Sequence, residues 1–158
     1  MPYVHLYKTD VKKQWIDYNG HMNVAYYVLV FDQATDSFLD AMEMGARYRQ
    51  EENKSFFVVE SHVSYEQEVT LGTPLVIQTK LLGFDKKRLH LFHEMFDENS
   101  GIRSATNEIL ALHVDMKTRK TTEISNSFYP VCKKTTSQSL VDGFPKGCGR
   151  TIKRLVTH

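Results

Sequence analysis

The sequence predicts an α+β domain built from one long helix and an antiparallel sheet that covers it. Between Val24 and Met42, apolar residues recur three and four positions apart, which is the period of a helix with one buried face. From Ser55 to Met116 the period changes to two, and turn residues divide this stretch into four segments, as in successive strands. A helix with one broad apolar stripe needs a sheet against that stripe, so the two patterns together favour this fold class.

The helix and the strand before it come first along the chain. Short alternation predicts a first strand over residues 3–15. The helix is expected to begin after Asn23, a residue type favoured at helix N-caps, and to end near Gly45. The polar segment 47–53 suits one further helical turn before the sheet begins. The predicted buried stripe of the long helix consists of Val24, Val28, Phe31, Thr35, Phe38 and Met42.

Four strands are predicted after the helix, at residues 55–69, 75–84, 88–96 and 102–116. In the first of these, alternation places Phe57, Val59, Val63 and Tyr65 on one side. Residues 71–74 and 85–87 have turn composition, and segment 97–101 (DENSG) is a hairpin signal. The predicted element order is therefore β-α-β-β-β-β, with the last four strands forming an antiparallel meander.

The composition is that of an ordinary globular protein. The 158 residues are 41% hydrophobic and 25% charged, and the formal net charge of +1 favours neither nucleic acid nor an anionic membrane as a partner. No apolar run approaches the length of a membrane span, and the N-terminus lacks a secretory signal. Cys132 and Cys148 have neither metal-ligand nor CxxC spacing, so we expect reduced thiols in a cytoplasmic protein, while the sequence leaves a bridge between them open.

The expected domain covers residues 1–132, and residues 133–158 are expected to form a basic C-terminal extension with little core of its own. Segment 128–130 (FYP) is expected to dock on the domain. We expect the extension to be partly disordered or to lie on a neighbouring subunit.

Residues 15–27 (WIDYNGHMNVAYY) are the most informative stretch of the chain. They place a carboxylate, Asp17, a few residues before the predicted start of the long helix. A carboxylate beside the unpaired N–H groups of a helix start suits chemistry in which an anion develops on a carbonyl oxygen. The same residue types also serve an ordinary capped helix preceded by a turn, so the spacing alone leaves both interpretations open.

Residues 3–117 resemble the hotdog-fold acyl-CoA thioesterases of the 4-hydroxybenzoyl-CoA thioesterase type, in which a loop bearing an Asp leads into a helix wrapped by a sheet. The spacing Asp17-x-Asn19-x-His21-x-Asn23 is similar to the D-x-N-x-H-x-N segment of plant acyl-ACP thioesterases. Residues 17–28 together with 88–95 (RLHLFHEM) look most like the betainyl-CoA thioesterases of carnitine breakdown. The resemblance implies a hotdog fold and hydrolysis of a small acyl-CoA, with betainyl-CoA as one candidate.

The resemblance also implies roles for individual residues. The backbone amide of Val24 would hold the oxyanion, and Asp17 would act as a nucleophile that forms a mixed anhydride or as a base for the attacking water. Asn19 and His21 would orient Asp17, bind the acyl group or position water, or else only scaffold the loop. Glu68 falls near the position of the downstream acid of the plant enzymes.

Substrate contacts are expected from three further groups. Ser64 lies on the second predicted strand, which in this family supplies residues that line the far side of the site. The polar side of that strand can also simply face solvent. The cluster of Lys86, Lys87 and Arg88 suits the phosphates of coenzyme A, or an exposed turn. The aromatic residues near the loop suit a cage around a trimethylammonium group, or the core: they are Trp15, Tyr26, Tyr27 and Phe31.

No metal or separate cofactor is expected, since coenzyme A enters as part of the substrate. His90 and His93 lie three apart on a predicted strand and so point to opposite faces, which prevents them from chelating one ion. A nucleophilic serine is not indicated, because there is no G-x-S-x-G motif. One sheet around one helix leaves an open edge, so we expect a homodimer paired through the second strand, which can pair further into tetramers.

Two other functions stay open at this stage. A hotdog enoyl-CoA hydratase or dehydratase would carry a D-x-N-P-x-H pattern, whereas Asp17 and His21 are four apart with no proline between them. A non-catalytic acyl-CoA-binding sensor would keep the pocket but not the acid. Release of free thiol distinguishes hydrolysis from both.

Overall fold

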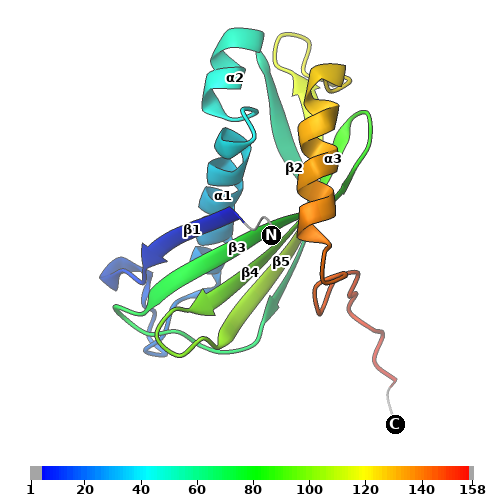
Figure 1. Cartoon of the computed structure of the whole chain (residues 1–158). Coiled ribbons are helices and arrows are strands. Elements are labelled where there is room, and N and C mark those ends of the chain that lie inside the picture. The colour runs from blue at the N-terminus through cyan, green and yellow to red at the C-terminus, as the bar shows by residue number, and fades with distance from the viewer. Residues whose placement is uncertain (1–4, 157–158) are drawn as a thin grey trace.

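The computed structural model describes residues 5–156 and confirms one long helix wrapped by an antiparallel sheet (Figure 1). The first strand is shorter than predicted, because the chain leaves the sheet at Asp10 and makes a 3-10 turn at Lys13–Trp15. Its first two predicted positions, Tyr3 and Val4, lie outside the described residues. The elements are β1 His5–Asp10, α1 Val24–Ala41, α2 Ala46–Glu52, β2 Lys54–Tyr65, β3 Pro74–Phe84, β4 Arg88–Asp97, β5 Arg103–Asp115, β6 Lys120–Thr121 and α3 Tyr129–Ser139.

The strands lie in the order β1-β3-β4-β5-β2, with the short β6 pairing to β5. Strands β3, β4 and β5 form the predicted meander, joined by tight turns at the two expected places. Strand β2 differs from the prediction, since it pairs with β5 rather than with β3. The connection 66–73 is too long for a tight hairpin and carries the chain from one side of the sheet to the other. Both β1 and β2 are therefore edge strands in the single chain.

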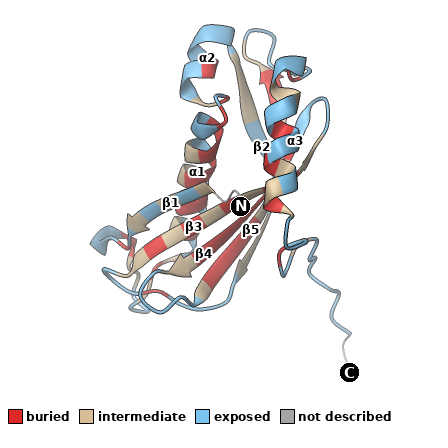
Figure 2. Ribbon diagram, in the orientation of Figure 1, coloured by how far each residue is buried: buried red, intermediate tan, exposed pale blue. Residues whose placement is uncertain are grey.

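Helix α1 buries a different stripe from the predicted one at its N-terminal end. Phe31, Thr35 and Phe38 are buried as expected, but Val24 and Val28 are 55% and 46% exposed. The residues that face the sheet near the N-terminus of α1 are instead Tyr27 and Val30. Figure 2 shows buried positions on α1 and through the central strands β3, β4 and β5.

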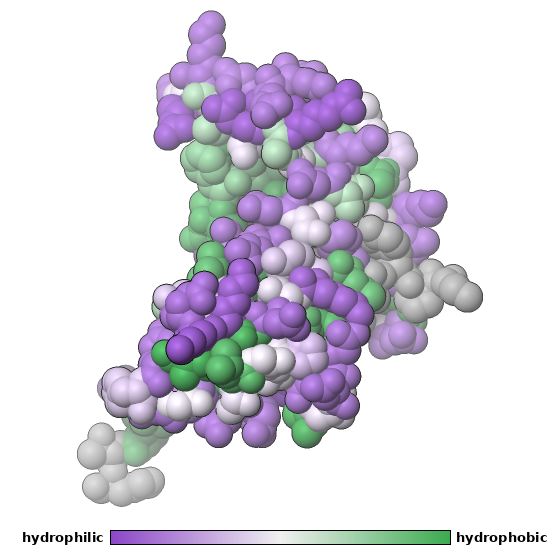
Figure 3. Space-filling view, turned by 90° about the vertical axis from the view of Figure 1, so that its left-hand side faces the viewer, coloured by the Kyte–Doolittle hydropathy of each residue, from purple (hydrophilic) through white to green (hydrophobic). Residues whose placement is uncertain are grey.

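Strand β2 also departs from simple alternation. Its register against β5 shifts between Val58 and Glu60, which is the signature of a β-bulge. Phe57, Val59 and Tyr65 are 39%, 52% and 48% exposed, so the predicted apolar side is largely uncovered in the single chain. On the side of the molecule drawn in Figure 3, hydrophobic surface (green) interrupts the polar surface in several places.

The segment after β6 has more structure than predicted. Helix α3 crosses the predicted boundary at residue 132 and buries Cys132, Thr135 and Ser139. Phe128 and Tyr129 pack against the core, which confirms the expected docking of that segment. Within the described residues, the pairing of β1 with β3 reaches Thr79, and further along β3 the Leu81 amide donates to Ser139 Oγ at 3.0 Å. Helix α3 thus packs against β3.

Within residues 5–156, no helix combines the length and the apolar character that crossing a membrane requires.

Candidate active site

The loop before α1 is a closed turn centred on Asp17. The Ile16–Met22 bridge closes it, and the amide of Asp17 donates to the His21 carbonyl at 3.2 Å. Gly20 adopts φ +81°, a left-handed conformation that few other residues tolerate, and its amide donates to the Asp17 carbonyl at 3.0 Å. The fully buried Met22 anchors the loop, and its amide donates to the Val69 carbonyl at 2.9 Å.

Both oxygens of the Asp17 carboxylate are held in place. Oδ1 accepts from the amide of Asn19 at 2.8 Å, and Oδ2 accepts from Asn23 Nδ2 at 3.1 Å. The other side-chain atom of Asn23, Oδ1, accepts from the amide of Ala25 at 3.0 Å and so caps α1. Asn23 therefore joins the carboxylate to the helix start. The sequence indicated Asn23 only as the cap, although it is the last residue of the D-x-N-x-H-x-N pattern.

Val24 is the first residue of α1, as predicted. The next two amides of the helix are occupied, since Ala25 donates to the side chain of Asn23 and Tyr26 donates to its carbonyl at 3.0 Å. Within the described residues, the amide of Val24 has no protein acceptor, as expected at a helix N-terminus. Asn23 thus links the two groups: its side chain holds the Asp17 carboxylate, and the amide of Val24 follows it in the chain.

His21 and Glu68 come together at the edge of this loop. The imidazole Nδ1 of His21 lies 3.2 Å from the Met22 carbonyl, and Nε2 lies 3.7 Å from Glu68 Oε2. Donation from Nδ1 to the carbonyl leaves Nε2 directed toward the carboxylate. Asn19 is exposed, and its backbone, rather than its side chain, contacts Asp17. The structure therefore brings together all five residues that were predicted as catalytic.

The four predicted cage residues do not form an open cage in the single chain. Trp15 and Tyr27 are each 3% exposed, and Phe31 is fully buried against His93. Trp15 stacks on the half-buried Tyr26 with 5.7 Å between ring centroids. Phe31 lies about two helical turns beyond Val24, the first residue of α1, so it packs in the core away from the loop.

Tyr65, which we did not predict as a substrate contact, lies closer to the helix start. Its hydroxyl lies 3.5 Å from the Val24 carbonyl, and its ring meets that of Tyr27 edge to face at 5.1 Å. Partial burial raises the pKa of both phenols, so both stay neutral at physiological pH. The sequence placed Tyr65 correctly on β2 but gave no sign that the end of β2 meets the start of α1.

The predicted phosphate contacts lie at the other end of the sheet from Asp17. The loop of Asp17 adjoins Val69 and the start of β3, whereas Lys86 and Lys87 lie between β3 and β4, at the far end of both strands. The ten residues of β4 separate these ends by about 30 Å. Arg88 is already paired with Asp85, at 2.6 Å between Nη2 and Oδ2.

Ser64 also lies apart from Asp17. The neighbouring Val63 packs on the core, so Ser64 points to the opposite face of the sheet. Its hydroxyl accepts from Arg150 Nη1 at 3.4 Å.

The structure confirms that His90 and His93 face opposite sides of the sheet. His93 is fully buried between two hydroxyls, with Nε2 2.9 Å from Thr35 Oγ1 and Nδ1 2.9 Å from Thr79 Oγ1. Thr35 donates to the Phe31 carbonyl, so its oxygen accepts from Nε2 of a neutral imidazole. Burial lowers the pKa of His93 to about 3. His90 contacts Glu108 instead, on the outer face.

Comparison with known proteins identifies the family of this chain. The family model described as the thioesterase-like superfamily matches residues 11–131. A betainyl-CoA thioesterase from Pseudomonas aeruginosa is 32% identical over 146 residues, which cover 92% of each chain. An L-carnitine dehydrogenase/betainyl-CoA thioesterase from Rhizobium meliloti is 33% identical over 153 residues, which cover 94% of this chain and 30% of that longer protein.

Solved structures show the same fold. A candidate thioesterase from Pseudomonas putida KT2440 superimposes with a TM-score of 0.83 at 33% identity, over 98% of this chain and 99% of that one. A Staphylococcus aureus protein, solved in complex with CoA, reaches a TM-score of 0.89 at 24% identity, over 98% of each chain, which supports the fold alone. The matched family model and the full-length relatives together show that the chain belongs to the thioesterase-like superfamily.

Proposed function

We propose that this thioester hydrolase cleaves a small acyl-CoA, with betainyl-CoA as the leading candidate, and that Asp17 and the amide of Val24 form its reaction centre. One observation carries the proposal: Asn23 Nδ2 donates to the Asp17 carboxylate at 3.1 Å, while Asn23 Oδ1 caps a helix whose first amide has no acceptor in the described part of the chain. The full-length relative from Pseudomonas aeruginosa is a betainyl-CoA thioesterase, which supports the choice of substrate.

The chemistry follows from these two groups. The thioester oxygen would accept a hydrogen bond from the Val24 amide, so negative charge that develops there meets an N–H group and the positive end of α1. Asp17 would then take a proton from water as the water adds to the carbonyl carbon, or would itself attack that carbon. When Asp17 acts as the base, the C–S bond breaks, the proton on Asp17 passes to the departing sulfur, and the free acid and coenzyme A leave. When Asp17 attacks the carbon, the C–S bond breaks to leave a mixed anhydride on Asp17, and the departing thiolate takes a proton from solvent. Water then hydrolyses the anhydride, which releases the free acid and restores Asp17. Neither route uses a metal.

We further propose that the active form is a homodimer paired through β2. The helix start and the end of β2 adjoin each other, and both carry exposed apolar residues. Burying such side chains and pairing an open strand edge both favour association. These residues are Val24, Val28 and Leu29 on α1, and Phe57, Val58, Val59 and Tyr65 on β2.

A two-fold axis through the middle of β2 also explains the distant cations. Antiparallel pairing of two β2 strands places the start of one strand beside the end of the other. Arg88 pairs across the sheet with Leu112, which in turn pairs with Phe57 near the start of β2. The Lys86 and Lys87 turn of one chain would therefore lie at the Asp17 end of its partner. There it would bind the coenzyme A phosphates.

The acyl group would meet Tyr65 and Glu68 rather than the predicted cage. Tyr65 is 48% exposed beside Val24, and Glu68 lies next to His21 on the same side of the loop. An aromatic face and a carboxylate both attract a trimethylammonium group. Tyr26, stacked on Trp15, would complete the wall.

Free-thiol release from a panel of coenzyme A thioesters tests this function. The panel contains betainyl, short straight-chain, long-chain and aryl thioesters, and crotonyl-CoA is followed separately for loss of enoyl absorbance. We expect selective release from betainyl-CoA. Selective turnover of another acyl group would contradict the substrate, hydration of crotonyl-CoA without thiol release would indicate a hydratase, and binding without turnover would indicate a sensor.

A further inference from the structure

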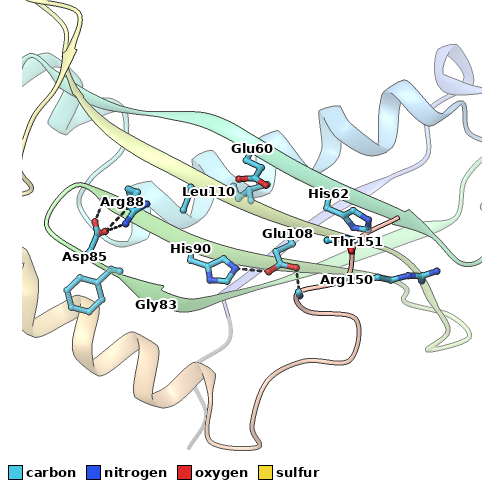
Figure 4. Close-up of a pocket in the computed structure, with 13 residues that line it drawn as sticks. Glu60, His62, Gly83, Asp85, Arg88, His90, Glu108, Leu110, Arg150 and Thr151 are labelled. Carbon is cyan, nitrogen blue, oxygen red and sulfur yellow. Dashed lines mark hydrogen bonds and ion pairs between the residues drawn. The ribbon is translucent and has the colours of Figure 1, made fainter. Parts of the chain in front are cut away.

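A pocket of about 470 Å³, lined by both charged and apolar residues, lies on the outer face of the sheet, opposite α1. Figure 4 shows that its lining residues come from β2, β4, β5 and the end of β3 with the turn after it, and that the C-terminal segment crosses one end of it. None of the residues of the Asp17 loop lines this pocket. The thioesterase chemistry proposed above therefore assigns no role to His62, His90 and Glu108, which line this pocket.

Three potential metal ligands converge at this end of the pocket. His90 Nε2 lies 2.7 Å from Glu108 Oε1, and Cys148 Sγ lies 3.5 Å from the same oxygen. One donor atom from each residue can be chosen so that all lie within 4.8 Å of one another. Glu108 and His62 are directly paired across β5 and β2, so the imidazole of His62 projects from the same face. Figure 4 shows His62 at the pocket beside Glu108.

We propose that His90, Glu108 and Cys148 bind a zinc-like divalent cation, with His62 as the fourth ligand. Imidazole, carboxylate and thiolate are the ligand types of Zn²⁺, which binds four ligands at about 2.0–2.3 Å in a tetrahedron. Ligand atoms in such a tetrahedron lie about 3.5 Å apart. The separations of 2.7 Å between His90 and Glu108 and 3.5 Å between Cys148 and Glu108 are near that value, whereas His62 lies outside this group of three and would have to turn toward it.

The arrangement does not suit the obvious alternative, a nucleophilic Cys–His–Glu triad. In such a triad the histidine lies between the thiol and the carboxylate, so that it can accept the thiol proton. Here Glu108 is the central residue and contacts both of the others. A bound cation would displace the thiol proton of Cys148 to solvent.

The surrounding contacts hold the ligands in place. His90 and Glu108 belong to adjacent central strands, and the second Glu108 oxygen accepts from the amide of Gly149 at 2.7 Å. Such a contact orients a ligating carboxylate. Arg103 Nη1 donates to the Lys146 carbonyl at 3.0 Å, which holds the chain just before Cys148. A cation at this site would therefore fasten the C-terminal segment to the sheet.

Titration with Co²⁺ tests the proposal, because a cobalt ion bound to thiolate has a charge-transfer absorption that a carboxylate or imidazole site lacks. The full chain is purified without a histidine tag and treated with chelator before titration. We expect one thiolate-bound Co²⁺ per chain, displaced by Zn²⁺. Cys148→Ser should abolish the absorption, His90→Gln should weaken binding by at least about tenfold, and Cys132→Ser, which changes the other cysteine, should keep both.

Limited trypsin digestion provides a second readout that does not depend on cobalt. If Zn²⁺ fastens the segment, cleavage after Lys146 and Arg150 should slow several-fold in wild type and stay unchanged in Cys148→Ser. Absence of the thiolate absorption, or its survival in folded Cys148→Ser, would overturn the site. Equal digestion of wild type with and without Zn²⁺ would count against it as well.

Discussion

Replacing Asn23 separates its two roles, because the residue both caps α1 and holds Asp17. Aspartate caps a helix about as well as asparagine, so Asn23→Asp keeps the bond to the Ala25 amide. It replaces the Nδ2–H that donates to Asp17 by an oxygen, and sets a second carboxylate about 3 Å from the first. Asn23→Ser also keeps the cap but only shortens the side chain, and serves as the uncharged control.

The expected size of the effect follows from those contacts. A hydrogen bond to a charged group contributes roughly 1.5–3 kcal/mol, so its loss should lower kcat by about 10- to 100-fold in both variants. In Asn23→Asp, repulsion of about 1–4 kcal/mol between the two carboxylates should in addition raise the pKa of the pair, which shifts the acid limb of the pH–rate profile upward by about one unit or more. Asn23→Ser should shift that limb less, because it removes the hydrogen bond but adds no second charge.

Steady-state thiol release between acid and neutral pH measures both effects, and thermal unfolding checks the cap. Both variants should keep a melting temperature within a few degrees of wild type, since the cap is retained. A wild-type rate and an unchanged pH–rate profile in folded Asn23→Asp would refute the inference that Asn23 positions Asp17.

Three further predictions concern the shared site, the acyl pocket and the core. Mixing Asp17→Asn chains with Lys86→Ser/Lys87→Ser chains should raise kcat/KM above that of either variant alone, because each mixed dimer contains one complete site. If kcat/KM does not rise, the two lysines do not contribute to the partner's site. Tyr65→Leu should lower kcat/KM for betainyl-CoA about 2- to 30-fold more than for its neutral isostere tert-butylacetyl-CoA, whereas Tyr65→Phe should not; equal losses would argue against a cation–π contact. The pKa of His93 is lowered from 6.5 to about 3, so the free energy of unfolding should fall as pH drops below 6.5. The loss from this group should be about 2 kcal/mol by pH 5, measured by urea unfolding, and His93→Gln should flatten the slope; an equally steep variant would refute it.

The start of α1 was the part of the site that the sequence predicted best. Asn23, Val24 and the turn at Gly20 are local features, and each is set by residues within a few positions of its own place in the chain. Capping and turn preferences act over that range, so a pattern in the sequence is enough to locate them. The same holds for the tight turns of the β3–β4–β5 meander.

The misses involve contacts between distant segments. Val24 and Val28 were predicted to be buried, yet the single chain leaves them exposed, because an apolar residue can face either a core or a partner. Helix α3 was missed because its sequence is polar and buries only a few positions against β3. The distance between Asp17 and the Lys86 turn depends on the strand order, which no local pattern specifies.

The proposed cation site was also beyond what local sequence patterns could predict. His90, Glu108 and Cys148 are separated by 18 and 40 residues, and only the pairing of β4 with β5 and the return of the C-terminal segment bring them together. The sequence therefore allowed the His90–His93 pair to be excluded but could not suggest the partners that His90 has in the fold.

The most direct test of the proposed reaction centre compares thiol release from betainyl-CoA by the wild type and by Asp17→Asn. A positioned carboxylate contributes about 10²–10⁴ to the rate, so Asp17→Asn should lower kcat by a hundredfold or more while the protein stays folded. Wild-type turnover in a folded Asp17→Asn protein would contradict the assignment of Asp17 as the catalytic carboxylate.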